Sequence, residues 1–279
     1  MSKIKIITDS TSDIPKGIAE KYDIEVLPLT IFFGNDEYKD WIDIEPKAFF
    51  ERMRNSDKLP TTSQVNPSSF KEKYELYLKD YDHIISLHLS SDASGTYSSA
   101  VIARDMVDKD RITVIDTRNF TYGFGQMVVE AAKMAKDGKS VEEIVERVKY
   151  LIKNVKTLFV VDTLEYLKKG GRLSATKATI GTLLNLKPIL TVDNGKIVAI
   201  DKARGMKKAL KRIVEIMKEQ GIQLKGQTVK LGHADSLENL KDFEAAIEDV
   251  YGHVDKEEFE IGCVIGVYCG PGTVVIHYE

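Results

Sequence analysis

The chain has 279 residues, of which 43% are hydrophobic and 30% are charged, and its formal net charge is −3. A chain of this length usually forms two domains, and this composition allows a buried core. The slightly acidic balance disfavours a nucleic-acid-binding protein, which normally carries a basic excess or a basic stripe.

The number of cysteines and the length of the apolar runs indicate the cellular location of the protein. Only two cysteines occur, Cys263 and Cys269, which is too few for a disulfide framework, and their spacing matches no recognised metal site. The N-terminal segment turns polar too early for a signal peptide. No run approaches the roughly 18 to 20 apolar residues that span a bilayer. These features predict a cytoplasmic protein without integral membrane association.

Short apolar runs alternate with helical patterns in the first half of the chain. We expect strands over residues 3–8, 24–33, 83–88 and 112–116. We expect helices over residues 15–22, 46–54, 67–78, 125–136 and 141–153. Pro28, inside the second run, predicts an edge strand or a bend. The alternation predicts a parallel sheet with helices on both faces, a three-layer α/β/α domain over residues 1–157.

The second half has a different pattern. We expect strands over residues 158–161, 186–192, 196–201 and 228–232, followed by a strand-rich tail. We expect helices over residues 175–184, 206–219 and 237–250. The turn Asp193-Asn194-Gly195 is typical of a β-hairpin. Together these elements predict an α+β domain with a mixed sheet over residues 158–279.

Polar side chains follow three of the expected parallel strands. The clusters are TDSTSDIP (8–15), SSDASGTYSSA (90–100) and DTRNFTYG (116–123), and a fourth, LPTTSQVNP (59–67), precedes a helix. Each cluster alone could simply cap a helix. Ligands of open parallel sheets bind at the carboxyl ends of the strands, however, so the shared rim predicts a polar site. Ser94, Gly95 and the following helix start would suit an anion, either a phosphate or a carboxylate.

No complete catalytic constellation can be identified. The sequence lacks a nucleotide P-loop and the G-x-S-x-G pattern of a hydrolase nucleophile. His83 and His88 lie five residues apart on one strand, so they point to opposite faces and form no metal pair. Asp9 and Asp13 could bind a metal or cap turns. A phosphoryl-transfer or phosphatase-like enzyme acting on a small anion at this rim remains an alternative.

Eight motifs, in order along essentially the whole chain, resemble those of the DegV family. They are TDSTSDIP, LPTTSQ, LSSDASGTYSSA, VIDTRNFTYGFG, VDTLEYLKKGGRLS, LLNLKPILTVDNGKI, KARGMKKAL and GPG. The resemblance implies a bacterial, non-catalytic protein of two α/β domains that binds a long-chain fatty acid between them. Many members carry the fatty acid for a separate ATP-using kinase subunit, which makes an acyl-phosphate for phospholipid synthesis. A lipid-sensing regulatory protein is a further alternative.

The resemblance also implies which residues hold the ligand. It places the fatty-acid carboxylate beside Thr62, with its neighbour Ser63, and beside Ser94, with Gly95. Tyr268 stands where kinase-associated members often have the histidine of an H-T-G-P-G motif. A hydroxyl that can donate a hydrogen bond therefore replaces an imidazole that can shuttle a proton.

Further residues are assigned to the tail and to the partner. Arg172 and Arg204 match family arginines that face the kinase subunit. The residues that could line an apolar tunnel for the tail are Phe120, Phe124, Met127, Ile180, Leu183, Leu184, Ile189 and Leu190. No cofactor or metal is expected, and the ligand would be the fatty acid itself.

Overall fold

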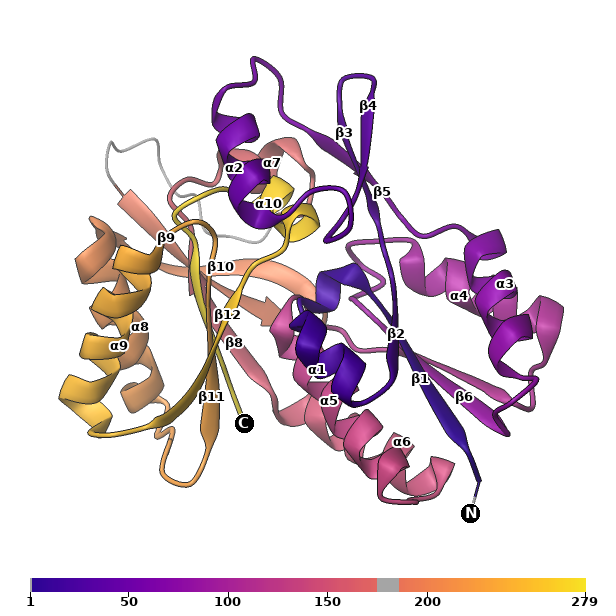
Figure 1. The fold of residues 1–279 in the computed structure, drawn as a ribbon. Coiled ribbons are helices and arrows are strands. Elements are labelled where there is room, and N and C mark those ends of the chain that lie inside the picture. Colours follow the sequence, from indigo (N-terminus) through magenta and orange to yellow (C-terminus); the bar gives the residue numbers. More distant parts are fainter. Residues whose placement is uncertain (1, 175–185) are drawn as a thin grey trace.

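A computed structural model describes residues 2–174 and 186–279. In it the chain forms two large lobes with a smaller layer above them, as Figure 1 shows. The expected helix over residues 175–184 lies outside the described residues, and so do Ile180, Leu183 and Leu184. None of the described helices is both long and apolar enough to cross a bilayer.

The first lobe is built on a four-stranded parallel sheet of order β2-β1-β6-β7. Its strands are β1 (Ile4–Asp9), β2 (Ile24–Leu27), β6 (His83–His88) and β7 (Ile112–Asp116). Helices α3 (Pro67–Tyr77) and α4 (Thr96–Val107) pack on the face that carries Ile84. The face that carries Ile85 packs against α1 (Lys16–Lys21), α5 (Tyr122–Lys136) and α6 (Val141–Asn154). The predicted three-layer α/β/α arrangement is confirmed.

The second lobe contains a six-stranded mixed sheet of order β10-β9-β8-β13-β11-β12. Its strands are β8 (Lys156–Val160), β9 (Leu186–Asp193), β10 (Lys196–Arg204), β11 (Thr228–His233), β12 (Asp255–Glu260) and β13 (Val274–Tyr278). Only β11 and β12 pair in parallel; the other neighbours are antiparallel. Helices α8 (Met206–Glu219) and α9 (Leu237–Tyr251) bury one face of this sheet. The α+β domain with a mixed sheet is therefore confirmed.

The smaller layer differs from the expected elements. The run 24–33 is two strands, because Pro28 lacks the N–H group that a continuous strand would need. After β2, the strand β3 (Thr30–Phe33) joins a separate antiparallel sheet with β4 (Asp36–Lys39) and β5 (Thr61–Ser63). The expected strand-rich tail contains a helix, α10 (Cys263–Cys269), beside α2 (Pro46–Arg54) and α7 (Glu165–Lys169). A short apolar run does not distinguish a strand from a buried helix.

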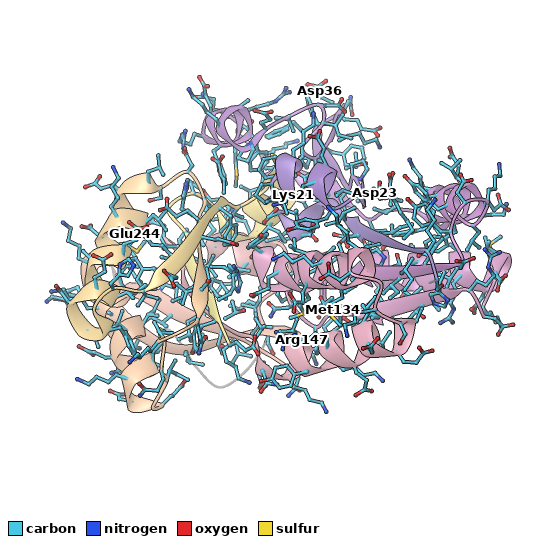
Figure 2. All side chains as sticks on the ribbon, turned by 60° about the horizontal axis from the view of Figure 1, so that its bottom comes forward. Lys21, Asp23, Asp36, Met134, Arg147 and Glu244 are labelled. Atoms are coloured by element: carbon cyan, nitrogen blue, oxygen red, sulfur yellow. The ribbon has the colours of Figure 1, made fainter. Side chains whose placement is uncertain are left out.

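The two lobes are joined along the polar rim of the first sheet. The Ser90 hydroxyl donates to the carbonyl oxygen of Gly195 at 2.7 Å, and Arg118 donates to the carbonyl of Asn194. At the opposite end, Arg147 of α6, labelled in Figure 2, reaches the Glu279 carboxylate at 3.4 Å. The boundary between residues 157 and 158 stays a prediction; the second sheet begins with β8 at Lys156.

Candidate functional site

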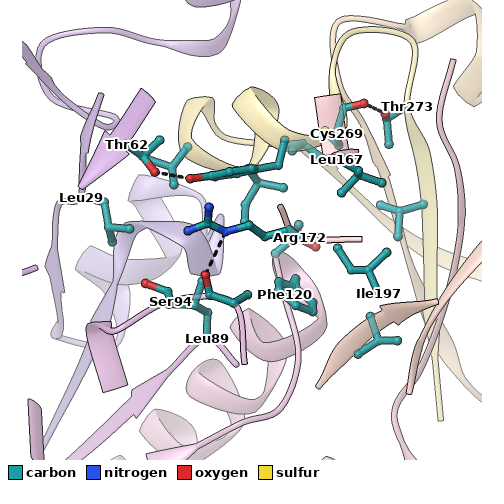
Figure 3. A pocket seen from close by; sticks show the side chains of 18 of the residues that line it. Leu29, Thr62, Leu89, Ser94, Phe120, Leu167, Arg172, Ile197, Cys269 and Thr273 are labelled. Atoms are coloured by element: carbon teal, nitrogen blue, oxygen red, sulfur yellow. Dashed lines mark hydrogen bonds between the residues drawn. The ribbon is translucent and has the colours of Figure 1, made fainter. Parts of the chain in front are cut away.

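A cavity of about 290 Å³ lies between the polar rim of the first sheet and one face of the second sheet, shown in Figure 3. Side chains alternate along a strand, so Val275 faces the cavity while its neighbours Val274 and Ile276 face α8 and α9. Most of the wall is apolar, with Leu29, Leu89, Phe120, Phe159, Leu167, Val192, Ile197, Ile261, Val264, Ile265 and Val275. Such a space suits a hydrophobic ligand with a few polar groups.

Three hydroxyl groups line the same part of the cavity wall, where Figure 3 shows Thr62 and Ser94 on either side of Arg172. Thr62 lies on β5, Ser94 precedes α4 and Tyr268 lies on α10; we call them the outer cluster. The hydroxyl oxygens of Thr62 and Tyr268 are 2.6 Å apart, and either can be the donor. One of their two hydrogens is therefore left over for a ligand. All three side chains are half-buried.

The loop before α4 is shaped by local hydrogen bonds and by a glycine. The Ser94 hydroxyl oxygen accepts from the N–H of Thr96 at 3.3 Å and lies 3.0 Å from the Thr96 hydroxyl. Gly95 allows Gln64 to cross the loop, because a Cβ there would lie 2.0 Å from Gln64 Oε1. The Gln64 amide then donates to Ser99 at 2.8 Å. Ser63 and Gly95 also line the cavity, next to the N-terminal N–H groups of the twelve-residue helix α4.

The two predicted arginines lie in different surroundings. Arg172 lines the cavity, with its guanidinium 4.6 Å from the centre of the Tyr268 ring. It also donates to the carbonyl of Ala93 at 3.1 Å, a bond drawn in Figure 3. Arg204, at the end of β10, is exposed and is not part of the cavity wall. Of these two arginines, Arg172 is the one that adds positive charge to the outer cluster.

The outer cluster and Arg172 have the chemistry that suits an anion. Hydroxyl hydrogens, the N-terminus of α4 and a guanidinium all stabilise negative charge, and no described side chain of the wall carries a carboxylate. A carboxylate has two oxygens that accept hydrogen bonds, so it could be shared by Ser94 and the Thr62–Tyr268 pair.

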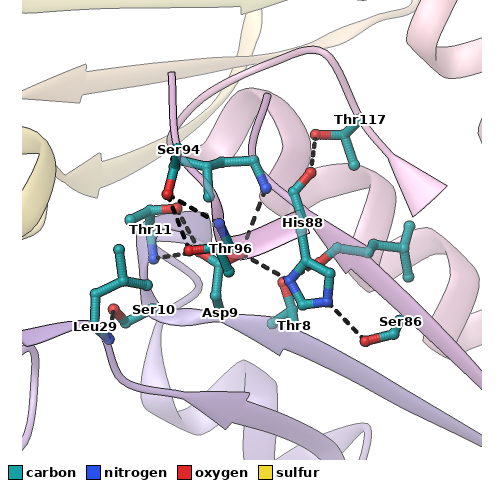
Figure 4. A network of polar contacts seen from close by, with 12 residues as sticks. Thr8, Asp9, Ser10, Thr11, Leu29, Ser86, His88, Ser94, Thr96 and Thr117 are labelled. Atoms are coloured by element: carbon teal, nitrogen blue, oxygen red, sulfur yellow. Dashed lines mark hydrogen bonds and ion pairs between the residues drawn. The ribbon is translucent and has the colours of Figure 1, made fainter. Parts of the chain in front are cut away.

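Asp9 and His88 have a structural role beneath this site. Asp9 accepts from the backbone N–H of Thr11 at 3.1 Å, and its second oxygen lies 2.9 Å from His88 Nδ1. The other ring nitrogen of His88 lies 2.7 Å from the Ser86 hydroxyl. Figure 4 shows these buried side chains bonded to each other. Among residues 2–174 and 186–279, no group of three or more histidine, cysteine or acidic side chains is placed to hold a metal ion.

A second polar group on the cavity wall combines Thr121, from the predicted cluster over residues 116–123, with two residues that the sequence motifs did not indicate. Thr121, Thr157 and His277 line the cavity, and we call them the inner cluster. His277 Nε2 lies 2.9 Å from the Thr121 hydroxyl, and its Nδ1 lies 2.8 Å from the Thr157 hydroxyl. Complete burial lowers the pKa of His277 to about 3, so the imidazole is neutral. The alternation of Thr273, just before β13, with Val275 and His277 on that strand is the sequence signal that could have indicated this face.

The residues expected to line an acyl tunnel are divided by the structure. Phe120 lines the cavity, while Phe124 and Met127 are buried in the core between α5 and the first sheet. Ile189 faces the α8 and α9 core, and Leu190 belongs to the main core without reaching the cavity wall. Sequence alone could not assign them, because core and tunnel positions share the same apolar pattern.

Comparison with known proteins identifies the family. The family model described as an uncharacterised protein of the DegV family matches residues 3–279. A DegV domain-containing protein of Caldanaerobacter subterraneus is 46% identical over 279 residues, covering 100% of this chain and 99% of that protein.

Two solved structures have the same fold over nearly the whole chain. A DegV family protein from Thermus thermophilus, described by its fatty acid binding, gives a TM-score of 0.91 at 33% identity, with 99% of each chain covered. DegV from Bacillus subtilis, described as a fatty acid binding protein, gives a TM-score of 0.87 at 37% identity, also with 99% of each chain covered. The chain belongs to the DegV family.

Proposed function

We propose that the protein binds one long-chain fatty acid in the cavity, with its carboxylate at the outer cluster. The main supporting observation is that Thr62, Ser94 and Tyr268 line the same part of a mostly apolar cavity. The apolar wall favours a hydrocarbon chain through the hydrophobic effect. The fatty-acid binding of the Thermus thermophilus and Bacillus subtilis relatives supports the same ligand.

The polar contacts have separate roles. Ser94 and either Thr62 or Tyr268 donate hydrogen bonds to the two carboxylate oxygens. Arg172 stabilises the bound anion through its charge and holds the Tyr268 ring in place through their stacking. Ser63 and Gly95 shape the entrance of this end. The chain itself supplies no phosphoryl-transfer chemistry in this proposal.

We further propose that the bound acid is presented to a separate ATP-using kinase subunit. The outer cluster is half-buried rather than sealed, so a partner can reach the carboxylate. Arg204 is exposed and lies outside the cavity wall, which suits a residue that contacts the partner rather than the ligand.

Ligand extraction tests the binding proposal. Purified protein is extracted with organic solvent, and mass spectrometry should detect about one long-chain fatty acid per chain. Ile197→Trp fills the cavity from β10 and should abolish the ligand, whereas Ile200→Trp, at an exposed position of the same strand, should keep it. If no fatty acid is recovered and none binds on addition, the proposal is wrong.

The kinase step is tested with a purified fatty acid kinase subunit, ATP and fatty-acid-loaded protein. Arg204→Glu should retain the fatty acid but lose most acyl-phosphate formation. Lys225→Glu, an equal change of charge at an exposed position in the loop between α8 and β11, should retain both. Equal acyl-phosphate formation by the two variants would show that Arg204 does not contact the partner.

A further inference from the structure

The inner cluster is polar although the cavity wall around it is apolar. The exposed fractions of Thr121, Thr157 and His277 are 5%, 4% and 1%. A buried hydroxyl or imidazole is costly unless its hydrogen bonds are satisfied. The direction of each hydrogen bond therefore decides what the cluster can offer to a ligand.

The chain of donors can be followed from the backbone. The N–H of Phe120 donates to Asn119 Oδ1 at 2.8 Å, which fixes that atom as an acceptor. The Thr157 hydroxyl donates to the same oxygen at 3.2 Å. The Thr157 hydrogen is then used, so its oxygen must accept the second bond, from the N–H of His277 Nδ1 at 2.8 Å.

The neutral imidazole completes the assignment. A neutral histidine carries one ring proton, so with Nδ1 protonated its Nε2 can only accept. The Thr121 hydroxyl therefore donates to Nε2 at 2.9 Å. Every hydrogen of the three side chains is used inside the protein. What Thr121 presents to the cavity is an oxygen with free lone pairs, an acceptor and not a donor.

The backbone of Thr121 supports a role for this hydroxyl. Its φ of 50° and ψ of −147° lie in a region that a β-branched residue rarely adopts. Such conformations cost of order 1–3 kcal/mol and gather at functional sites. Thr121 precedes α5, yet its side chain makes no capping bond and turns to His277 instead. A glycine would adopt this backbone more easily but would lose the acceptor.

The inner and outer clusters come from different elements of the cavity wall. The inner cluster lies just before α5 and on β8 and β13, and the outer cluster lies on β5, just before α4 and on α10. Thr273 adjoins the end of α10, where its hydroxyl donates to the carbonyl of Cys269 at 3.0 Å. His277 follows four residues later on β13 and faces the same cavity, about 13 Å away along a strand. The inner cluster is therefore separated from the end of α10, the helix that carries Tyr268, by roughly the length of eleven bonds of an extended chain, at about 1.1–1.2 Å per bond.

We propose that the inner cluster is a second polar subsite, which accepts a hydrogen bond from a hydroxyl group on the acyl chain, away from the carboxylate. The proposal rests on the proposed function and narrows its ligand to a fatty acid with a hydroxyl group along its chain in preference to an unsubstituted one. Thr121 is the residue that makes the contact. A carboxylate at this wall would meet only acceptor oxygens, so the same cluster excludes an inverted fatty acid.

Calorimetric titration of delipidated protein tests the proposal with three kinds of probe. They are octadecanoic acid, its 10- and 12-hydroxy derivatives, and its 3-hydroxy derivative. At least one mid-chain derivative should bind about threefold to tenfold more tightly than octadecanoic acid, the usual worth of one neutral hydrogen bond. The 3-hydroxy derivative, whose hydroxyl lies near the carboxylate, should gain nothing from Thr121.

Two variants separate the contact from general packing. Thr121→Val keeps the branched shape without the hydroxyl, and it should remove the mid-chain preference while still binding octadecanoic acid. Thr121→Ser retains the hydroxyl and should keep the preference. This variant tests the contact even if the valine variant folds poorly. Equal affinities of wild-type protein for all the C18 acids would overturn the proposal, as would a preference that survives in Thr121→Val. Failure of every acid to bind would instead overturn the proposed function.

Discussion

The outer and inner clusters use the same kinds of side chain to opposite effect. In the outer cluster the Thr62 and Tyr268 hydroxyls share one bond of either direction, so a hydrogen is free for a ligand. In the inner cluster Thr121 and Thr157 are bonded to a buried neutral histidine, and their hydrogens are fully used. The outer cluster can donate a hydrogen bond to a ligand, whereas the inner cluster can only accept one.

The difference shows that residue type does not determine what a hydroxyl offers. A threonine can donate or accept, and its neighbours decide which. Half-burial leaves the outer hydroxyls free to turn toward an anion, whereas complete burial fixes the inner ones. Four measurements test this difference between the two clusters.

The largest expected effect is the acid sensitivity of the inner cluster. Burial lowers the pKa of His277 from its ordinary value of 6.5 to about 3. Between pH 6.5 and 3 the unfolded chain therefore binds a proton at this residue and the folded chain does not. Stability due to His277 is complete above pH 6.5 and falls by about 5 kcal/mol as the pH drops to 3.

This loss is measured as the difference between the urea-unfolding free energies of wild-type protein and His277→Gln across that pH range. Burial raises the pKa of Asp40 to about 6, so as the pH falls the folded chain binds a proton there before the unfolded chain does. The Asp40 contribution to stability therefore has the opposite sign, and it cancels in this difference because both proteins contain Asp40. Nuclear magnetic resonance of the His277 ring gives an independent reading. A ring that titrates near pH 6.5 in the folded protein would contradict the buried neutral assignment.

Removal of one outer donor should weaken ligand binding. Ser94→Ala deletes a hydroxyl at the carboxylate end, and we expect a loss of about 1.5–3 kcal/mol in octadecanoic acid affinity, because hydrogen bonds to charged groups are the stronger ones. Ser98→Ala, at an exposed position in the first turn of α4, serves as the control. If Ser94→Ala binds octadecanoic acid with unchanged affinity, Ser94 does not hold the carboxylate.

Substitution of two glycines tests how rigid the surroundings of the inner and outer clusters are. A Cβ at Gly123 would lie 2.7 Å from Asn119 Oδ1 and 2.7 Å from the His277 ring, both buried and bonded. Gly123→Ala should therefore destabilise the protein by about 1–3 kcal/mol in urea unfolding. Gly95→Ala meets the end of the exposed Gln64 side chain, which can swing away, so its unfolding free energy should change by less than about 1 kcal/mol. Equal losses would show that both ends are equally rigid.

The smallest expected effect belongs to the Tyr268 hydroxyl. Tyr268→Phe removes the bond to Thr62 but keeps the ring beneath Arg172. Fatty-acid affinity, measured by calorimetry, should fall by about 0.5–1.5 kcal/mol, the worth of one hydrogen bond. Tyr268→His restores a donor at this position and should recover part of the loss. A phenylalanine variant with full affinity would place the carboxylate on Ser94 and Thr62 alone.

Much of the architecture could be predicted because it follows from local periodicity. The strand over residues 83–88 and the helices over 46–54 and 206–219 have the expected bounds. The helix α10 could not be recognised, because its seven residues are apolar throughout and show no helical period. Its packing against α2, where Gly266 approaches Phe49 and Phe50, is a tertiary contact.

Sequence patterns were sufficient to predict an α/β lobe and an α+β lobe, the polar rim at the ends of the parallel strands, and the motifs around Thr62 and Ser94. Only the tertiary structure brought Tyr268 to within 2.6 Å of Thr62, across 206 residues, and buried His277 between Thr121 and Thr157. The physical reason is that strand and helix patterns arise between near neighbours. The donor or acceptor character of a hydroxyl depends on partners that only the packing of distant elements supplies.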